Sequence, residues 1–548
     1  MQSNHRFWIG TVCLVLGGFC AVAVGARELQ TDGKPARPDG RRGAAASDAR
    51  ALAGQIDRLL AAGWAEAKVQ PAPPADQAEY LRRVYLDLVG KVPTAALALD
   101  FLDDPSPDKR TRLVETLLDS PAYLTHATEA YRMLLLPEAD TDLQLRGLTP
   151  TFEAWLRKKV ADEAGYDQIV KEVLTVRLGS LGRRAGIAHD PRAEPSPLAY
   201  YVAKDAKPEN LAAGTARTFL GIRLECAQCH NHPFDHWKRE QFWGLAAFFA
   251  GVSKQGKADA PGPIREVADR HELAIPETRQ IVKAAFLDAK IPQWGRKTAG
   301  REVLADWVTA PDNPYFARAA VNRVWARFFG TGIIDPVDDL RPDNPPSHPE
   351  LLDLLARQFR SHGYDQKFLI RTITATKAYA LTSAVGRSET APASLFAAMP
   401  VRTLSPGQLF ETLAQATGFR DGSRGTFVYE GSAKDRFVEL FTNRDEKPTE
   451  GETSILQALA LMNGPLMASV TSPENSDTLA AVAQAPYLDT PGRIETLYLA
   501  ALTRRPRPDE LLRLVPYVER GGPSGDRSKA LADVFWALLN SPEFRFNH

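Results

Sequence analysis

Apolar residues recur three and four positions apart along most of the chain after residue 47, a spacing that predicts amphipathic helices with one buried face. Alternating runs typical of strands are scarce. Two of the clearest stripes are Leu52, Ile56, Leu59 and Leu60 before Gly63, and Leu81, Val84, Tyr85 and Leu88 before Gly90. The pattern predicts a mainly α fold with two or three helical domains.

Residues with known preferences for helix ends mark further boundaries. Asn313, which precedes a proline, predicts the start of a helix that runs to Gly330, a residue suited to the left-handed conformation that stops a helix. Ser347 and Glu350 have the spacing of a capping box, and Gly363 predicts the end of that second helix.

Composition and periodicity divide the chain into five segments. Residues 1–26 form an apolar leader, and residues 27–46 lack an apolar period, which predicts a flexible linker. Residues 47–255 and 301–548 carry the helical stripes and predict two main units. Residues 256–300 contain turn residues without a core stripe, so we expect a linker region there.

The leader has the plan of a secretory signal. Arg6 precedes an apolar run from Phe7 to Val24, and the small residues Gly25 and Ala26 suit a signal-peptidase site. We therefore expect cleavage after Ala26 and a periplasmic or secreted protein with no membrane span after cleavage. The apolar run is long for a signal, and an uncleaved anchor is the alternative.

The balance of charge argues against a nucleic-acid partner, and the cysteine content argues against a disulfide framework. The 548 residues include 67 basic and 67 acidic side chains, which removes the usual electrostatic basis for a nucleic-acid partner. Cleavage would also remove Cys13 and Cys20, leaving Cys226 and Cys229 of the four cysteines. Such a protein has no disulfide framework and depends on core packing.

The remaining cysteines lie in the sequence "LECAQCHNHPFDHW", residues 224–237. C-x-x-C-H is the attachment pattern of c-type haem, because two thiols at this spacing can reach the two vinyl groups of one porphyrin. His230 would then lie beneath the iron as the proximal ligand. A helix-like apolar pattern leads into Cys226, which predicts a site of the form helix, CxxCH, loop, helix.

Two other interpretations of this segment stay open. Cys226, Cys229, His230, His232 and Asp235 include enough donors for zinc or non-haem iron, with His230, His232 and Asp235 as metal ligands beside the thiolates. Alternatively, Cys226 and Cys229 form a local disulfide among ordinary surface histidines.

A sixth haem ligand would have to come from elsewhere in the fold. His232 follows His230 by two residues, a span of at most about 7 Å, which is too short to pass around a porphyrin. An open sixth position is equally allowed. The eligible side chains are His126, Met133, His189, His348 and Met462.

Other chemical patterns are weak or absent. The sequence contains no G-x-S-x-G elbow, no H-E-x-x-H motif and no phosphate-binding glycine loop, so no catalytic residue is assigned. Asp335, Asp338, Asp339 and Asp343 lack the regular spacing of a calcium loop, and we expect them in a solvated loop.

Several segments resemble a known pair of domains. "FLGIRLECAQCHNHPFDHWKREQFWGLAAFFAGV" is similar to the hallmark of a large family of secreted planctomycete proteins named for a cytochrome-like character. "NPYFARAAVNRVWARFFGTGIIDPVDDL", "SHPELLDLLARQFRSHGYDQKFLIRTITATKAYALTS" and "ALADVFWALLNSPEFRFNH" resemble the domain that follows it in that family. Together the resemblance covers most of the chain from about Ile56 to the end.

The resemblance implies haem attachment at Cys226, Cys229 and His230, and it places the H-P-F-D motif of the family at residues 232–235. This chain departs from the family in two ways: it lacks the additional cytochrome domain of many relatives, and His236 stands where relatives usually have proline.

We therefore expect an exported cytochrome-like protein that carries c-type haem and exchanges electrons with an extracytoplasmic partner. The alternative is a non-haem metal-binding or structural module of the cell envelope, linked to polysaccharide or sulfatase systems. The sequence predicts no oligomeric state.

The mature protein should begin at Arg27. The reason is that the small residues before the cut suit signal peptidase. N-terminal sequencing of exported material checks this expectation. Recovery of Met1 would instead support the uncleaved anchor.

Overall fold

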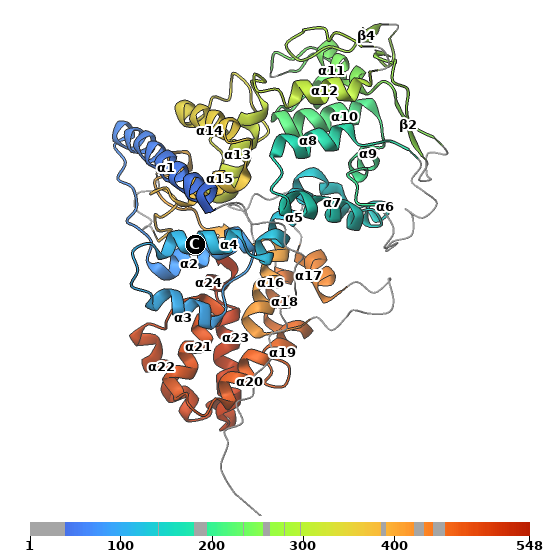
Figure 1. The fold of residues 1–548 in the computed structure, drawn as a ribbon. Helices are drawn as coiled ribbons and strands as arrows, with labels where there is room; N and C mark the ends of the chain where they lie inside the picture. The colour runs from blue at the N-terminus through green and yellow to red at the C-terminus, as the bar shows by residue number, and fades with distance from the viewer. Residues whose placement is uncertain are drawn as a thin grey trace, which may run out of the picture. The chain divides into compact units, whose positions relative to one another are not determined.

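Helices dominate the computed structural model, which confirms the predicted mainly α fold (Figure 1). Residues 45–548 form one compact unit. The expected signal, residues 1–26, lies outside the described residues, and none of the described helices is long and apolar enough to cross a membrane. The structure describes residues 39–140, 142–179, 194–233, 235–255, 263–278, 280–295, 298–384, 391–420, 432–441 and 455–548.

The first part of the chain is almost entirely helical (Figure 1). Its α-helices are α1 (Asp39–Ala67), α2 (Gln77–Val89), α3 (Ala95–Asp103), α4 (Lys109–Leu118), α5 (Pro121–Leu135), α6 (Leu143–Arg146), α7 (Thr149–Ala161), α8 (Tyr166–Thr175), α9 (Ala199–Ala203), α10 (Pro208–Thr215) and α11 (Arg239–Ala246).

The second part is also helical, with two very short strands, one between α15 and α16 and one at the C-terminal end. Its elements are α12 (Gly300–Val308), α13 (Phe316–Phe329), α14 (Pro349–Ser361), α15 (Gln366–Thr374), β5 (Arg402–Thr403), α16 (Pro406–Thr417), α17 (Ala433–Phe441), α18 (Ile455–Asn463), α19 (Pro465–Val470), α20 (Asp477–Gln484), α21 (Thr490–Leu502), α22 (Pro508–Glu519), α23 (Arg527–Leu539), α24 (Pro542–Arg545) and β6 (Phe546–Asn547). β5 and β6 pair antiparallel.

Several helix ends follow the sequence prediction. Gly90 and Gly330 have φ values of 73° and 71° and end α2 and α13 in the left-handed conformation. The side chain of Asn313 accepts hydrogen bonds from the backbone N–H groups of Tyr315 and Phe316 at 2.9 and 3.0 Å, so it holds the turn that leads into α13. Local chemistry is sufficient to predict these boundaries.

Helix α1 is longer than its apolar stripe at both ends. This helix starts at residue 39, inside the linker expected over 27–46, and continues past Gly63 to Ala67. Alanine has the highest helix propensity, and residues 44–46 are all alanine, which explains how the helix extends into a segment without an apolar stripe.

The predicted capping box of α14 is wrong. The hydroxyl of Ser347 donates to the carbonyl of Ile333 at 3.1 Å, and the residue at the N-cap is His348, which makes no capping bond with its side chain. A tertiary hydrogen bond has replaced the local one. Gly363 nevertheless adopts a φ of 64° just after the helix, as expected.

Two small antiparallel strand pairs lie at or just before the stretch expected as a linker region over 256–300. They consist of β1 (Val252–Lys254) with β2 (Ile264–Glu266), and β3 (Glu272–Ala274) with β4 (Ile281–Lys283). Ile264, Ile275 and Leu287 from this stretch are buried in the core. Strands of three residues are too short to give a recognisable alternation, so the sequence pattern did not reveal them.

The hydrophobic core does not divide at residues 256–300. Its larger cluster includes buried side chains from Ala49 to Met399, and its smaller cluster joins residues 404–544 to Leu86 and Val92. Helix α2 contributes to both clusters, because Leu86 faces the smaller one while Leu81 faces the larger. The sequence pattern predicts residues 47–255 and 301–548 as two main units, and this shared core disfavours independent folding of either one.

A buried carboxylate on α2 binds three segments from the second part of the chain. The Asp87 side chain is 4% exposed and accepts hydrogen bonds from Arg402 at 2.9 and 3.0 Å. It also accepts from the Tyr379 hydroxyl at 2.7 Å and from the Asn547 amide at 2.8 Å. Burial raises the pKa of Tyr379 well above its usual value, so this phenol stays a hydrogen-bond donor.

Two buried arginines next to Asp87 bind backbone carbonyls in the same region. Arg83 donates to the carbonyls of Tyr379 and Leu381 at 2.6 and 2.8 Å. Arg82 donates to the carbonyls of Phe544 and Ala501 at 2.7 and 3.1 Å. Burial lowers the pKa of Arg82 to about 10, which still leaves it charged at neutral pH. Helix α2 therefore contacts the C-terminal helices both through buried hydrogen bonds and through the hydrophobic core.

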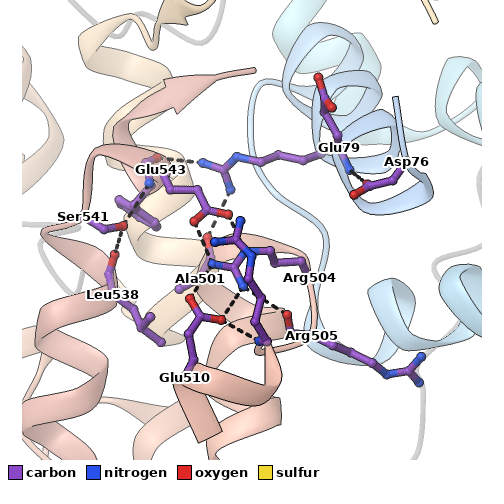
Figure 2. Close-up of polar contacts among 12 residues, drawn as sticks. Asp76, Glu79, Ala501, Arg504, Arg505, Glu510, Leu538, Ser541 and Glu543 are labelled. Carbon is purple, nitrogen blue, oxygen red and sulfur yellow. Dashed lines mark hydrogen bonds and ion pairs between the residues drawn. The ribbon is translucent and has the colours of Figure 1, made fainter. Parts of the chain in front are cut away.

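A second ion cluster joins α22 and α24 close to these contacts. Figure 2 shows Arg504 between Glu510 and Glu543, which it contacts at 2.8 and 2.9 Å. The hydrogen bonds from Arg504 lower the pKa of Glu510 to about 2. The two glutamates thus share one guanidinium where the last helices of the chain meet.

Asp87→Ala should destabilise the protein by about 3–5 kcal/mol, because it leaves Arg402 buried without its counter-charge. Urea unfolding checks this prediction. Asp509→Ala is the matched control, since the Asp509–Arg513 pair is exposed and its loss should have little effect. Equal effects of the two substitutions would show that Asp87 does not hold the fold together.

Candidate functional site

The chain approaches the C-A-Q-C-H motif through a helix that stops early. Helix α10 continues into a π-helical turn, η2 (Ala216–Leu220), which ends at Gly221 with a φ of 69°. The positive φ favours glycine at this position, and a Cβ there would also lie 2.8 Å from a methyl carbon of Leu340, which would have to shift. The helix before the motif therefore ends at residue 220, a few residues short of the turn that carries Cys226. π-helical turns occur frequently at functional sites.

The two cysteines lie on and directly after a short 3₁₀ turn, η3 (Glu225–Gln228). Cys226 and Cys229 are both exposed and both carry free thiols, and His230 directly after them is also exposed. All three side chains of the motif are therefore accessible from solvent.

The hydrogen bond of His230 indicates which nitrogen of its ring carries the proton. Nδ1 of His230 lies 2.7 Å from the carbonyl oxygen of Asn231. A carbonyl oxygen can only accept, so Nδ1 carries the proton and the lone pair of the neutral ring lies on Nε2. This arrangement is typical of a metal-binding histidine, whose other nitrogen donates to a carbonyl or a carboxylate.

The loop after His230 closes on itself through a backbone and a side-chain contact. The His232 N–H donates to the carbonyl of Trp237 at 2.8 Å. Asp235, with a side chain only 6% exposed, accepts from the His236 backbone N–H at 2.7 Å and contacts His236 Nδ1 at 2.6 Å. The carboxylate of Asp235, one of the expected metal ligands, therefore orients His236.

Hydrogen bonds from residues of α11 hold the motif and the residue after it in place. The carbonyl of Gln228 accepts from Trp243 Nε1 at 3.0 Å and from Arg239 Nε at 3.3 Å, and the Asn231 side chain accepts from the Arg239 backbone at 3.0 Å. Trp237 is 2% exposed, and its indole N–H has no partner among the described residues. A buried donor without an acceptor beside the motif is the kind of group that a bound ligand satisfies.

An ion pair from the second part of the chain supports the segment before the motif. Asp338, whose side chain is 9% exposed, accepts from Arg217 Nε at 2.6 Å and from Arg223 at 2.7 and 2.9 Å. The backbone N–H of Leu340 donates to the carbonyl of Gly221 at 2.9 Å. The expectation of a solvated loop at Asp338 is wrong, because these two arginines hold its carboxylate.

The possible metal ligands do not converge. Among the described residues, no three His, Cys, Asp or Glu side chains are grouped as a metal site. Cys226, Cys229, His230, His232 and Asp235 therefore share one loop without forming a coordination sphere there, and their roles stay predictions.

The structure does not single out a sixth ligand. His189 lies outside the described residues. Burial lowers the pKa of His126 to about 3, and the His348 ring packs against Gly63 of α1. Met133 and Met462 are exposed on α5 and α18.

Two family models match the chain. Residues 55–254 match PSCyt2, described as a protein of unknown function (DUF1549), and residues 300–518 match PSD1, described as a protein of unknown function (DUF1553). No curated protein and no solved structure matches the chain. The motif cysteines lie in the first matched region, and Asp338 lies in the second.

Asp338→Asn should destabilise the protein by about 1–2 kcal/mol at neutral pH, a modest value because both arginines are partly exposed. Burial raises the pKa of Asp338, but the hydrogen bonds from Arg223 and Arg217 outweigh it, so the folded-state pKa lies below its usual value. A lowered pKa stabilises the fold above the unfolded-state value of about 4 and loses this effect as pH falls through the folded-state pKa.

Urea unfolding of both proteins from pH 7 to pH 3 checks the pH dependence. The difference between wild type and Asp338→Asn should stay constant down to about pH 5 and shrink below about pH 4. Asp353→Asn, in an exposed pair with Arg318, is the control and should change little. A stability difference between wild type and Asp338→Asn that grows as pH falls would contradict a lowered pKa of Asp338 in the folded protein.

Proposed function

The chain carries the PSCyt2 and PSD1 domains, and from the motif in the first of them we propose that it is an exported cytochrome-like protein that binds c-type haem. Cys226 and Cys229 would form the two thioether bonds, and Nε2 of His230 would be the proximal ligand. The bound haem would supply one-electron redox chemistry, and the expected partner is an extracytoplasmic redox protein.

The observation that carries this proposal is the hydrogen bond from His230 Nδ1 to the carbonyl of Asn231. It leaves Nε2 with the lone pair, on an exposed ring directly after the second cysteine. The protein therefore favours the tautomer that a haem ligand needs before any haem is attached.

The thiols also fit the attachment chemistry. Each must be free and reachable, and Cys226 and Cys229 are both exposed and unbonded. Each thiol would add across one vinyl group, with its sulfur bonding one carbon and its hydrogen the other. The buried indole N–H of Trp237, which has no partner among the described residues, is available as a donor to a bound group.

The loop residues would act indirectly in this proposal. His232 closes the loop through its backbone hydrogen bond to Trp237, and Asp235 orients His236. Both would position the loop around His230 without binding the iron themselves.

A non-haem metal site is the second candidate, and the Asp235–His236 contact favours it. A carboxylate that binds Nδ1 of a histidine commonly orients Nε2 toward a metal. Zinc or non-haem iron would then take His236 Nε2 and the thiolates, together with the expected ligands His230, His232 or Asp235. In that case the protein would be a metal-binding module of the cell envelope.

The absorption spectrum and metal content of a variant set distinguish these proposals, with protein produced in a host able to attach haem. For haem, Cys226→Ser and Cys229→Ser should each remove one thioether, and the double variant should lose covalent haem. His230→Ala should retain attached haem with a changed spin state, because the proximal nitrogen is missing.

His236→Ala serves as the control within the same loop. Under the haem proposal it should leave attachment intact and shift the spectrum at most modestly, as should changes at His232 and Asp235. Under the non-haem proposal these same changes should lower metal content as strongly as loss of a cysteine does. Wild-type protein without haem and without metal would contradict both proposals.

A further inference from the structure

A cavity of about 270 Å³ opens between α1, α2, α4 and α15, which lie together in Figure 1. None of the residues discussed at the C-A-Q-C-H motif lines it. Its lining consists of Ala46, Ala49, Arg50, Tyr80, Arg110, Thr111, Val114, Glu115, Arg371, Thr374, Ala375, Thr376, Lys377 and Ala380.

The cavity has an excess of positive charge. Four cationic side chains line it, whereas Glu115 is the one acidic side chain of the lining. Arg371 contacts both oxygens of Glu115 at 2.9 to 3.0 Å, so that carboxylate is already satisfied. Arg50, Arg110 and Lys377 have no matching carboxylate within the lining.

Two further carboxylates lie nearby without neutralising these groups by direct contact. Asp57 accepts from the backbone N–H of Lys377 at 2.8 Å and also interacts with the charge of Lys377, but no hydrogen bond joins it to the ammonium group in the described part of the chain. Asp76 interacts with Arg110 through charge alone and caps α2 with its side chain.

The cations keep unused hydrogen-bond donors. Arg110 donates Nε to Gln77 and Nη2 to the carbonyl of Ala75, while its guanidinium lies 4.1 Å from the ring centre of Tyr80. Its Nη1 remains available. In the part of the chain that the structure describes, the side chains of Arg50 and Lys377 make no hydrogen bond and no ion pair.

The rest of the lining is mixed. Four alanines and one valine make its apolar part, and Tyr80 and three threonines complete it: Ala46, Ala49, Ala375, Ala380, Val114, Thr111, Thr374 and Thr376. Free cationic donors beside alanine and valine side chains suit a ligand with a negative head and a less polar body, because the head takes the donors while the body covers the apolar part of the lining.

We propose that this cavity binds a small organic anion through an oxyanion head group, either a carboxylate, a sulfate ester or a phosphate ester. Arg50, Arg110 and Lys377 bind the head, and the alanine-lined wall between α1 and α15 contacts the body. Arg371 is held by Glu115 and shapes the cavity. This site is independent of haem attachment and of the C-A-Q-C-H motif.

Calorimetric titration of the full mature chain with benzoate, phenyl sulfate and phenyl phosphate tests the proposal. These probes share an apolar ring and differ in the head group, and benzyl alcohol is the neutral counterpart. At least one anion should bind saturably, more tightly than benzyl alcohol, with an affinity that falls as salt is raised.

The double variant Arg50→Gln/Lys377→Gln should weaken that binding by about tenfold or more, because two charged donors are lost. Both residues are exposed and make no described side-chain hydrogen bonds, so the variant should keep the melting temperature of the wild type. Arg58→Gln removes one charge from the exposed face of α1 outside the cavity and should leave the affinity unchanged. Absence of saturable binding, or equal weakening by Arg58→Gln, would overturn the proposal.

Discussion

The structure depends on one buried carboxylate. Asp87 binds Arg402, Tyr379 and Asn547, which follow it by about three hundred to more than four hundred residues in the sequence. A buried charge without a partner is costly, so α2 reaches its native environment only when the C-terminal segments are in place. The same helix donates Arg82 to carbonyls of the last helices and contributes to both hydrophobic clusters. This constraint makes residues 45–548 one unit in spite of their two matched family regions.

The candidate site also depends on a carboxylate that pairs with residues far away in the sequence. Asp338, in the region that matches PSD1, binds Arg217 and Arg223, which flank the turn before the cysteines in the region that matches PSCyt2. The second domain therefore contributes directly to the support of the motif. This contact gives a physical reason for the two domains to occur in one chain, because the segment that presents Cys226 is incomplete without Asp338.

The sequence predicts what depends on neighbouring residues and misses what depends on distant ones. The ends of α2 and α13 follow from Gly90 and Gly330, since only local backbone geometry decides them. Ser347 has the right local spacing for a helix cap, but its hydroxyl donates to the carbonyl of Ile333, which lies outside the helix. The motif itself is visible as Cys226 and its neighbours, whereas the supporting role of Asp338 has no local signal. A carboxylate that pairs across more than a hundred residues looks like any other acidic loop residue.

The central claim is that this scaffold presents C-A-Q-C-H for covalent haem attachment. The most direct measurement is the intact mass of the denatured mature chain, produced in a host that attaches haem. The account predicts the mass of the chain plus one haem, retained after acid extraction because two thioether bonds hold it. A mass equal to the bare chain, or lower by two hydrogens for a Cys226–Cys229 disulfide, would contradict it.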